Sequence, residues 1–576
     1  MKYKILAVGM LSSACWIYGF GPQTFFQPRS QAVNAVRELV GWQTAIHQAD
    51  MDHWYGSVSG TVEYGRSFRQ EALAKLFFGS NQVTFSGSLV PDRGPNDILA
   101  DYFGLPFCFE STVCFTPRIS NVVFDLDWYQ GFDSCVPGLY LIVHLPIVHS
   151  KADLHMQEQV ISGVNDTCAQ ETFYPAGYMA SVSVSRSQMN TNVQQAFIGH
   201  TAVGALEPLQ FGRIFGREIR SRIAELQFTL GYTFLLSDWY HLGLGLRVAL
   251  PTGNRPDMVF LLDATVGNGH HWEVGGQLTS HVRLWESDTL RHALALYLDA
   301  NITHLCADTQ NRSYDLTTQG TGSRYMLLQE YAVDSTDLQL SATGPAAPYQ
   351  FIGHILPAIN VTTLPSVISI AVQADIVFKL AYQSDDGFEL DLGYNCYARS
   401  KEKLGCRQKL PANRFVAKGD AQVYGFNAAN EPIRLGVSQS KATVYKAQDG
   451  GNFVAGAAYV NVNADSPVPA FDGSGAAINQ LNSTDAAALG IAQAQINTSN
   501  PTLFITDTDI NESSALVARA VSHTLFVHAN KSWWIEGESL TPCIGAGIST
   551  ELGAHCLREN SALSQWRIWL KGGLSY

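Results

Sequence analysis

The sequence predicts an all-β protein: a transmembrane, antiparallel, up-and-down β-barrel of about 14–16 strands with long extracellular loops. Three observations predict this fold. Apolar and polar residues alternate with period two in many segments, and short polar turns alternate with long connections. Charged residues make up only 15% of the 576 residues, although no apolar run is long enough for a membrane-spanning helix. Soluble domains contain about 25% charged residues.

The first residues indicate export. Two lysines precede an apolar stretch over residues 5–11, and small residues follow it. This order is typical of a secretory signal peptide, and the stretch is shorter than the ~20 residues of a spanning helix. We predict a signal peptide over residues 1–21, with cleavage somewhere between Ala14 and Gly21. Cleavage is favoured over lipidation at Cys15, because Ser12 stands where a lipidation signal has an apolar residue.

Residues 22–52 form a separate N-terminal segment. Apolar residues between positions 31 and 47 are spaced more like those of a helix than those of a strand, which predicts a short helix. Only some thirty residues lie between the cleavage region and Trp54, too few for the plug domain of an energised-transport receptor. The alternation that starts at Trp54 predicts a barrel over residues 53–576.

The alternating segments also predict what faces the lumen. Successive side chains of a strand point to opposite faces, and a Lys or Arg that faces lipid at the bilayer midplane costs ~2–4 kcal/mol. The charged face must therefore point inward. The predicted pore-lining residues are Asp125, Asp127, Arg247, Glu273, Arg283, Asp299, Asp375, Lys379, Glu389, Asp391, Arg567 and Lys571. Adding Glu63, Glu551 and Arg399 gives nine acids against six bases, a lining of −3 that predicts a weak preference for cations.

The connections differ between the two predicted rims. Tight polar turns occur at 237–238, 286–288 and 385–387, whereas the connections at 251–270, 306–323 and 400–420 are long. This asymmetry is typical of a barrel with a periplasmic and an extracellular rim. Residues from about 447 to 518 contain no Lys or Arg and predict a long low-complexity loop. An external position is favoured over a position folded into the lumen.

The last strand carries the most specific motif. One face presents Trp566, Ile568, Leu570, Leu574 and Tyr576, the final residue, and the other face carries Gln565, Arg567, Lys571 and Ser575. An amphipathic last strand ending in an aromatic residue resembles the assembly signal of Gram-negative outer-membrane barrels. By general class, the chain resembles outer-membrane porin-like proteins. The resemblance implies an outer-membrane location in a Gram-negative-type bacterium, contact with outer-membrane lipid and folding by the barrel-assembly machinery.

The sequence predicts no catalytic residues, no cofactor and no metal site. Adjacent His270 and His271 would point to opposite faces of a strand, and no Gly-x-Ser-x-Gly elbow occurs. Two lumen carboxylates such as Asp125 and Asp127 are ordinary in a pore. The formal charge of −13 argues against general nucleic-acid affinity, which needs a basic face.

Nine cysteines remain after export into an oxidising compartment, so some are expected to pair. The expected disulfides are Cys396–Cys406 and Cys543–Cys556, because each pair flanks a predicted reversal of the chain.

The leading functional prediction is a porin-like channel, not an enzyme, for passive diffusion of small hydrophilic solutes or ions. One alternative is a surface-exposed adhesive or binding barrel that uses its long loops, and a second is an outer-membrane hydrolase. The sequence leaves open the solute specificity, the pore width, the disulfide connectivity and whether the chain forms a homo-oligomer.

Overall fold

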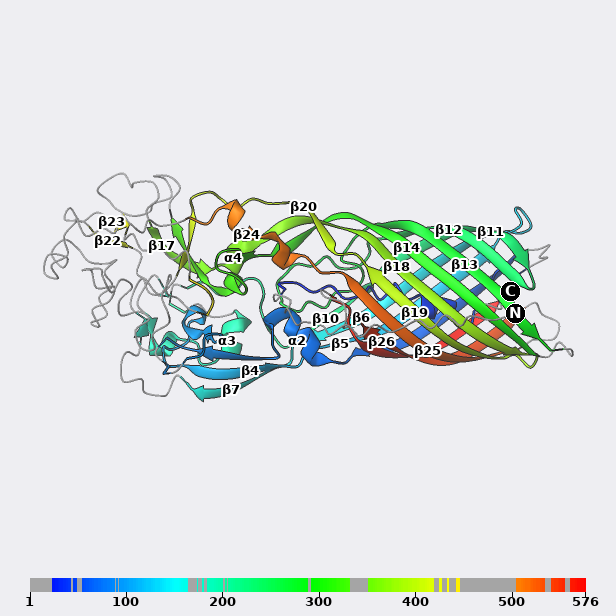
Figure 1. The fold of residues 1–576 in the computed structure, drawn as a ribbon, viewed down its shortest axis with the longest axis horizontal. Coiled ribbons are helices and arrows are strands. Elements are labelled where there is room, and N and C mark those ends of the chain that lie inside the picture. Colours follow the sequence, from blue (N-terminus) through cyan, green and yellow to red (C-terminus); the bar gives the residue numbers. More distant parts are fainter. Residues whose placement is uncertain are drawn as a thin grey trace, which may run out of the picture.

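A closed antiparallel β-barrel forms one end of the molecule, and a body of smaller sheets and helices forms the other (Figure 1). The coordinates are a computed structural model. They describe residues 23–42, 45–48, 54–88, 90–91, 93–163, 173–174, 179–180, 184–199, 203–204, 206–287, 292–331, 351–418, 424–426, 432–434, 442–445, 504–533, 540–554 and 560–576. The predicted signal peptide and most of the predicted loop at 447–518 lie outside the described residues.

Twelve strands close the barrel, each antiparallel to its two neighbours, and β5 pairs with β6 to complete the circle. They are β1 (Tyr55–Ser67), β5 (Arg118–Gly131), β6 (Leu139–Asp153), β11 (Leu226–Ser237), β12 (Tyr240–Leu250), β13 (Glu273–Glu286), β14 (His292–Ser313), β18 (Thr363–Ser384), β19 (Phe388–Arg399), β25 (Ala520–Ser532), β26 (Thr541–Gly553) and β27 (Gln565–Ser575). The predicted fold class is confirmed.

The closed circle is narrower than the 14–16 strands expected. Two further strands belong to the same sheet, β10 (Arg217–Ile223) and β20 (Glu402–Arg407). β10 pairs with the half of β6 that β11 leaves free, and β20 pairs with β18 beyond the end of β19. These strands therefore lengthen the wall and do not widen it.

The two faces of the barrel differ in chemistry, as the period-two pattern predicts. Outward side chains are large and apolar, and Leu230, Leu246 and Leu570 are 54–61% exposed. Inward neighbours such as Thr229 and Arg247 are buried. Only a hydrocarbon surrounding makes such an outer face favourable, because exposed apolar surface of this extent is costly in water.

Among the described residues, no helix is both long enough and apolar enough to cross a bilayer.

The two rims also differ, as predicted. At one rim β11 and β12 are joined by residues 238–239, and β18 and β19 by residues 385–387. Gly387 has φ +84°, and a Cβ there would lie 2.3 Å from the carbonyl oxygen of Ser532, so this turn requires glycine. At the opposite rim the connections are long. By the barrel rule, the short turns are periplasmic and the long connections extracellular.

The long connections build an ordered extracellular body. One sheet contains β2 (Gln82–Ser86), β3 (Ile98–Leu99), β4 (Glu110–Phe115) and β7 (Met156–Ser162). A second contains β16 (Leu327–Tyr331), β17 (Phe351–Pro357) and β21 (Phe415–Lys418). Three two-stranded sheets pair β8 (Phe173–Tyr174) with β9 (Val184–Ser185), β15 (Asp315–Leu316) with β24 (Ile510–Asn511), and β22 (Tyr424–Phe426) with β23 (Pro432–Arg434). A large apolar core that includes Phe85, Phe103, Phe197 and Tyr325 holds this body together.

The helices are short. The α-helices are α1 (Ala35–Leu39), α2 (Gln70–Phe78), α3 (Val193–Ile198) and α4 (Ile359–Thr362). The 3-10 helices are η1 (Ala100–Phe103), η2 (Arg186–Gln188), η3 (Ser323–Tyr325), η6 (Asp507–Asp509) and η7 (Glu512–Ala515). All except α1 lie in the long connections.

An ionic cluster ties together strands of the second extracellular sheet. The His354 ring donates from Nδ1 to Glu330 Oε2 at 2.5 Å and faces Glu207 Oε1 at 3.1 Å from Nε2. Arg414 Nε donates to Glu330 Oε1 at 2.6 Å. The hydrogen bond between His354 and Glu330 raises the pKa of His354 and lowers the pKa of Glu330. Both charged forms are therefore favoured at neutral pH.

The two expected disulfides are wrong. Cys396, Cys406 and Cys543 are free thiols, and Cys556 lies outside the described residues. The chain does not reverse between Cys396 and Cys406, because β20 continues along β18 in the direction of β19. The expectation that some cysteines pair is confirmed, since Cys108 is disulfide-bonded.

Candidate functional site

The N-terminal segment lies inside the barrel. Residues 23–42 and 45–48, here called the plug segment, contact inner-face residues from one rim to the other. Near the extracellular rim, Gln27 Nε2 donates to the carbonyl oxygen of Gly267 at 3.1 Å. Near the periplasmic rim, His47 Nδ1 lies 3.2 Å from Thr233 Oγ1. The segment therefore runs along the lumen.

The plug segment contains the helix that the sequence predicts, but the helix is short. The Asn34 side chain caps α1 by accepting from the backbone N–H of Arg37. The apolar side of α1, which includes Val36 and Leu39, packs against inner-face residues of four strands: Ala295, Tyr297, Val377, Ala381, Phe526 and Trp569. A helix of five residues is unstable alone, so the barrel wall stabilises it.

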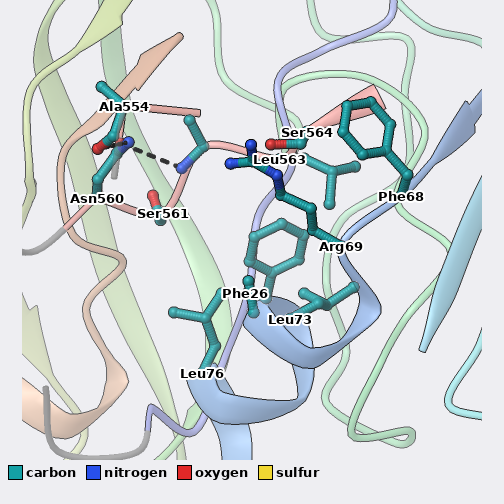
Figure 2. Close-up of a pocket in the computed structure, with 12 residues that line it drawn as sticks. Phe26, Phe68, Arg69, Leu73, Leu76, Ala554, Asn560, Ser561, Leu563 and Ser564 are labelled. Carbon is teal, nitrogen blue, oxygen red and sulfur yellow. Dashed lines mark hydrogen bonds between the residues drawn. The ribbon is translucent and has the colours of Figure 1, made fainter. Parts of the chain in front are cut away.

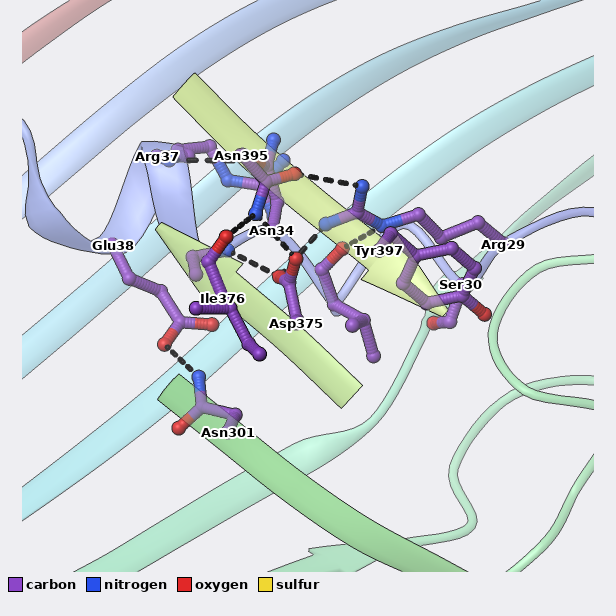
Figure 3. Close-up of polar contacts among 12 residues, drawn as sticks. Arg29, Ser30, Asn34, Arg37, Glu38, Asn301, Asp375, Ile376, Asn395 and Tyr397 are labelled. Atoms are coloured by element: carbon purple, nitrogen blue, oxygen red, sulfur yellow. Dashed lines mark hydrogen bonds and ion pairs between the residues drawn. The ribbon is translucent and has the colours of Figure 1, made fainter. Parts of the chain in front are cut away.

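Arg29 fixes the plug segment to one side of the barrel (Figure 3). Its Nη2 lies 2.7 Å from Asp375 Oδ2 on β18, and its Nη1 lies 3.4 Å from Glu551 Oε1 on β26. The guanidinium also stacks on the ring of Tyr397, 4.4 Å from its centroid. All three partners are buried. Buried charges need such pairing, because taking an ion out of water costs several kcal/mol.

Arg37 fixes the plug segment to the adjoining wall. Its Nε donates to Asp125 Oδ2 on β5 at 2.5 Å, and its Nη1 lies 3.3 Å from Glu63 Oε1 on β1. Its Nη2 donates to the carbonyl oxygen of Gln31 at 2.7 Å. Each of the three guanidinium nitrogens therefore has a protein partner. The side chain is 1% exposed, so water has little access to it.

Two further contacts hold α1 from opposite sides. Arg247 on β12 donates from both terminal nitrogens to the Glu38 carboxylate at 3.0 Å. Lys571 on β27 donates from Nζ to the carbonyl oxygen of Arg37 at 2.8 Å. Paired arginine–carboxylate contacts are among the stronger ionic hydrogen bonds. The plug segment is thus bound by charges from several strands.

The structure places all twelve predicted lumen residues on the inner face. Two of them are half-buried, Arg283 and Asp299. The other ten are buried: Asp125, Asp127, Arg247, Glu273, Asp375, Lys379, Glu389, Asp391, Arg567 and Lys571. Some contact each other, as Lys379 Nζ and Asp391 Oδ1 do at 3.4 Å. Others contact the plug segment, so in this structure the lumen is not the open passage that a channel for passive diffusion needs.

Sequence reasoning missed the residues that fill the lumen. Arg29, Arg37 and Glu38 precede the first strand, where no alternation marks them. Their partners on the barrel strands lie 26 residues or more away, so no local spacing links them. His144 was missed as well, although its position in β6 has the inward parity.

Two cavities that the described residues form beside the plug segment are small. One cavity of about 20 Å³ is lined by Arg29, Arg37, Glu63 and Arg567, among others, and it has room for about one water molecule. A second, of about 110 Å³, lies where Phe26 meets Leu73 and Leu76 of α2 (Figure 2). It is smaller than the ~300 Å³ at which small-molecule pockets begin.

The residues of the predicted assembly signal lie on the outer face of β27. Ile568, Leu570, Leu574 and Tyr576 are exposed and Trp566 is half-buried. The backbone of Tyr576 exchanges two hydrogen bonds of 2.9 Å with Gly56. β27 thereby joins β1 and closes the sheet. Their role in assembly stays a prediction.

Comparisons with known proteins give weak similarities. No family model matches the sequence, and no curated protein matches it. Among solved structures, an outer-membrane channel from Pseudomonas putida F1 covers 90% of this chain and 96% of its own, with 9% identity and a TM-score of 0.32. The toluene transporter TodX from Pseudomonas putida covers 97% and 98%, with 8% identity and a TM-score of 0.29. A Pseudomonas aeruginosa FadL homologue covers 91% and 90%, with 6% identity and a TM-score of 0.25.

TM-scores this low carry no argument. The fold is instead assigned from the strand pairing and the outer face of the barrel. Twelve strands close without an unpaired edge, and their outer face is apolar. Lipid accepts only a spanning structure whose backbone groups are all paired internally. The chain is a membrane-spanning β-barrel protein.

Proposed function

We propose that this protein is an outer-membrane channel for small hydrophilic solutes or ions, closed in the present state by its plug segment. The observation that carries the proposal is the pairing of Arg29 and Arg37 with lumen carboxylates. These two cations occupy the space that a solute would cross, and they do so through contacts that can be exchanged for water.

The chemistry of the wall supports a hydrophilic solute. The inward faces of the twelve strands include nine acidic and at least seven basic residues, among them Arg312 on β14, which lies against Phe25 of the plug segment. Once the plug segment leaves, water would hydrate these groups. An apolar solute in the same space would strip them of hydrogen bonds, and each unpaired polar group costs about 1–3 kcal/mol.

Passage requires movement of the plug segment. The cavity beside Arg29 and Arg37 has room for about one water molecule. The plug segment ends shortly before β1, so it can leave the lumen through the periplasmic rim without breaking a strand.

The test is single-channel conductance in planar lipid bilayers. A variant that lacks residues 23–48 should give large, steady openings, and the full-length protein should be closed most of the time. Lys531→Gln is the matched control, because Lys531 forms an exposed ion pair with Asp386 at the periplasmic rim, away from the lumen. A deletion variant that migrates as a folded barrel and yet conducts no ions would overturn the proposal.

The extracellular body favours a second candidate, a surface-binding function. β14 and β18 are 22 residues long, so they rise about 70 Å along the strand, well beyond a hydrocarbon band of ~25 Å. They contribute to an ordered body with its own apolar core. Host-cell binding by the purified protein, tested with and without that body, would support this candidate.

A further inference from the structure

Three metal-ligating side chains meet on the inner face of two neighbouring strands. Asp125 and Asp127 lie on β5, and His144 lies on β6 directly opposite Asp127 in the strand register. One potential ligand atom from each lies within 4.8 Å of the others, and all three residues are buried. A strand pair brings i, i+2 and a cross-strand residue together on one face.

Two carboxylate oxygens in this cluster have no hydrogen-bond partner among the described residues. Oδ1 of Asp125 and Oδ1 of Asp127 are both buried, and neither accepts a hydrogen bond. Asp127 Oδ1 lies 3.6 Å from His144 Nε2. A buried, unpaired acceptor is costly, and a charged one more so, which indicates a ligand that the protein atoms do not provide.

The neighbouring groups orient the histidine as metal sites require. His144 Nδ1 lies 2.7 Å from Gln227 Oε1, which can only accept, so Nδ1 carries a proton. Nε2 lies 2.7 Å from Asp125 Oδ2, and a bound metal ion would replace the proton between these two atoms. Arg247 donates to the same Gln227 oxygen and fixes it. Ser59 Oγ donates to Asp127 Oδ2 at 3.4 Å. In metalloproteins, hydrogen bonds of this kind orient the side chains that bind the metal ion.

We propose that Asp125, Asp127 and His144 bind a divalent transition-metal ion of the Zn²⁺ class. Two ligands about 2.1 Å from a tetrahedral ion lie about 3.4 Å apart, close to the 3.6 Å between His144 Nε2 and Asp127 Oδ1. One imidazole nitrogen with two carboxylates suits Zn²⁺ better than Mg²⁺ or Ca²⁺, which take oxygen ligands. Three protein ligands leave a fourth position open to water or solute.

The site and the plug segment compete for the same carboxylate. Arg37 Nε donates to Asp125 Oδ2 at 2.5 Å, so the guanidinium supplies the positive charge that the metal ion would bring. A dication in the cluster repels Arg37 and weakens one of the ionic anchors of the plug segment. This coupling rests on the proposed function, whereas metal binding itself does not.

The test is calorimetric titration of the folded, full-length protein in detergent with ZnCl₂, and with MgCl₂ for comparison. Loss of an outer-shell partner alone typically weakens metal affinity 10–100-fold, so Asp127→Asn and His144→Gln should each weaken Zn²⁺ binding at least tenfold. His149→Gln is the matched control, because His149 lies on the same strand but bonds Ser221 at an exposed position. Arg37→Gln should tighten Zn²⁺ binding about tenfold or more, because the competing cation is gone.

Unchanged Zn²⁺ affinity in both Asp127→Asn and His144→Gln would overturn the site. An affinity unaltered by Arg37→Gln would overturn the competition. If either ligand variant fails to migrate as a folded barrel, the wild-type protein is titrated with Co²⁺ and its visible absorption is recorded. The absence of a spectrum of bound Co²⁺ would then overturn the proposal. Bilayer conductance without added metal tests plug closure separately, so the two failures are distinguishable.

Discussion

Replacing Arg37 by glutamine should release the plug segment. The change removes a cation that is 1% exposed and leaves the carboxylates of Asp125 and Glu63 without it. Breaking a buried ion pair by removing one partner costs about 3–5 kcal/mol. Both carboxylates keep other partners, because Asp125 still faces His144 at 2.7 Å and Glu63 still accepts from Asn34 at 3.2 Å. The lower end, about 3 kcal/mol, is therefore expected.

A loss of about 3 kcal/mol in the plugged state shifts its equilibrium with the unplugged state about 150-fold, since 1.4 kcal/mol is a factor of ten. The assay is open probability of single channels at neutral pH, with Lys531→Gln as control. Exposed ion pairs contribute about 0–1 kcal/mol, so the control should change little. Equal open probabilities for Arg37→Gln and the control would refute the assigned role of the buried ion pairs.

Four further outcomes are expected. Tyr576→Ala should reduce assembly into heat-modifiable barrels far more than a change in an extracellular loop, because β27 closes the sheet; normal outer-membrane levels of the variant would contradict this. The unplugged channel should prefer cations modestly, and more so at low salt; reversal potentials across a salt gradient that indicate anion preference would show that the lumen face is misassigned. The charged pair of Glu330 and His354 should protect the backbone amides of β16 and β17 from hydrogen exchange. That protection should fade as pH falls below the ordinary Glu value of about 4.5, and again as pH rises through the raised pKa of His354; exchange protection that is flat across this range would argue against the pair. Mass mapping under non-reducing conditions should find Cys396 and Cys406 as thiols, and a peptide linking them would contradict the strand register.

The inner face of the barrel could be predicted because strand geometry is local. Side chains alternate at every residue, so Arg247 and Lys571 had to lie opposite their apolar neighbours, and both are buried inside. The alternation of apolar and polar side chains ends where a strand leaves the membrane. β14 continues from Cys306 to Ser313 with polar residues on both faces, since both are outside lipid there, and the sequence predicted a loop from Cys306.

The plug segment could not be predicted because its contacts are long-range. Arg37 and Asp125 are 88 residues apart, and Arg29 and Glu551 are 522 apart. Helical spacing indicates that the segment contains a helix, but it carries no information about where that helix packs. The two expected disulfides failed for a related reason, because sequence separation alone cannot show whether a chain turns back or continues along the same neighbour.

The position of the plug segment imposes an order on biogenesis. The plug segment precedes every strand of the barrel in the chain, yet two of the side chains around it belong to the last strand: Lys571 holds α1, and Arg567 contacts Glu63. The barrel closes only when β27 pairs with β1, so the surface that holds α1 is complete only once the last strand is in place. A chain that stalls before its final strand would therefore leave both an open seam and a plug segment that lacks the contacts of Lys571 and Arg567.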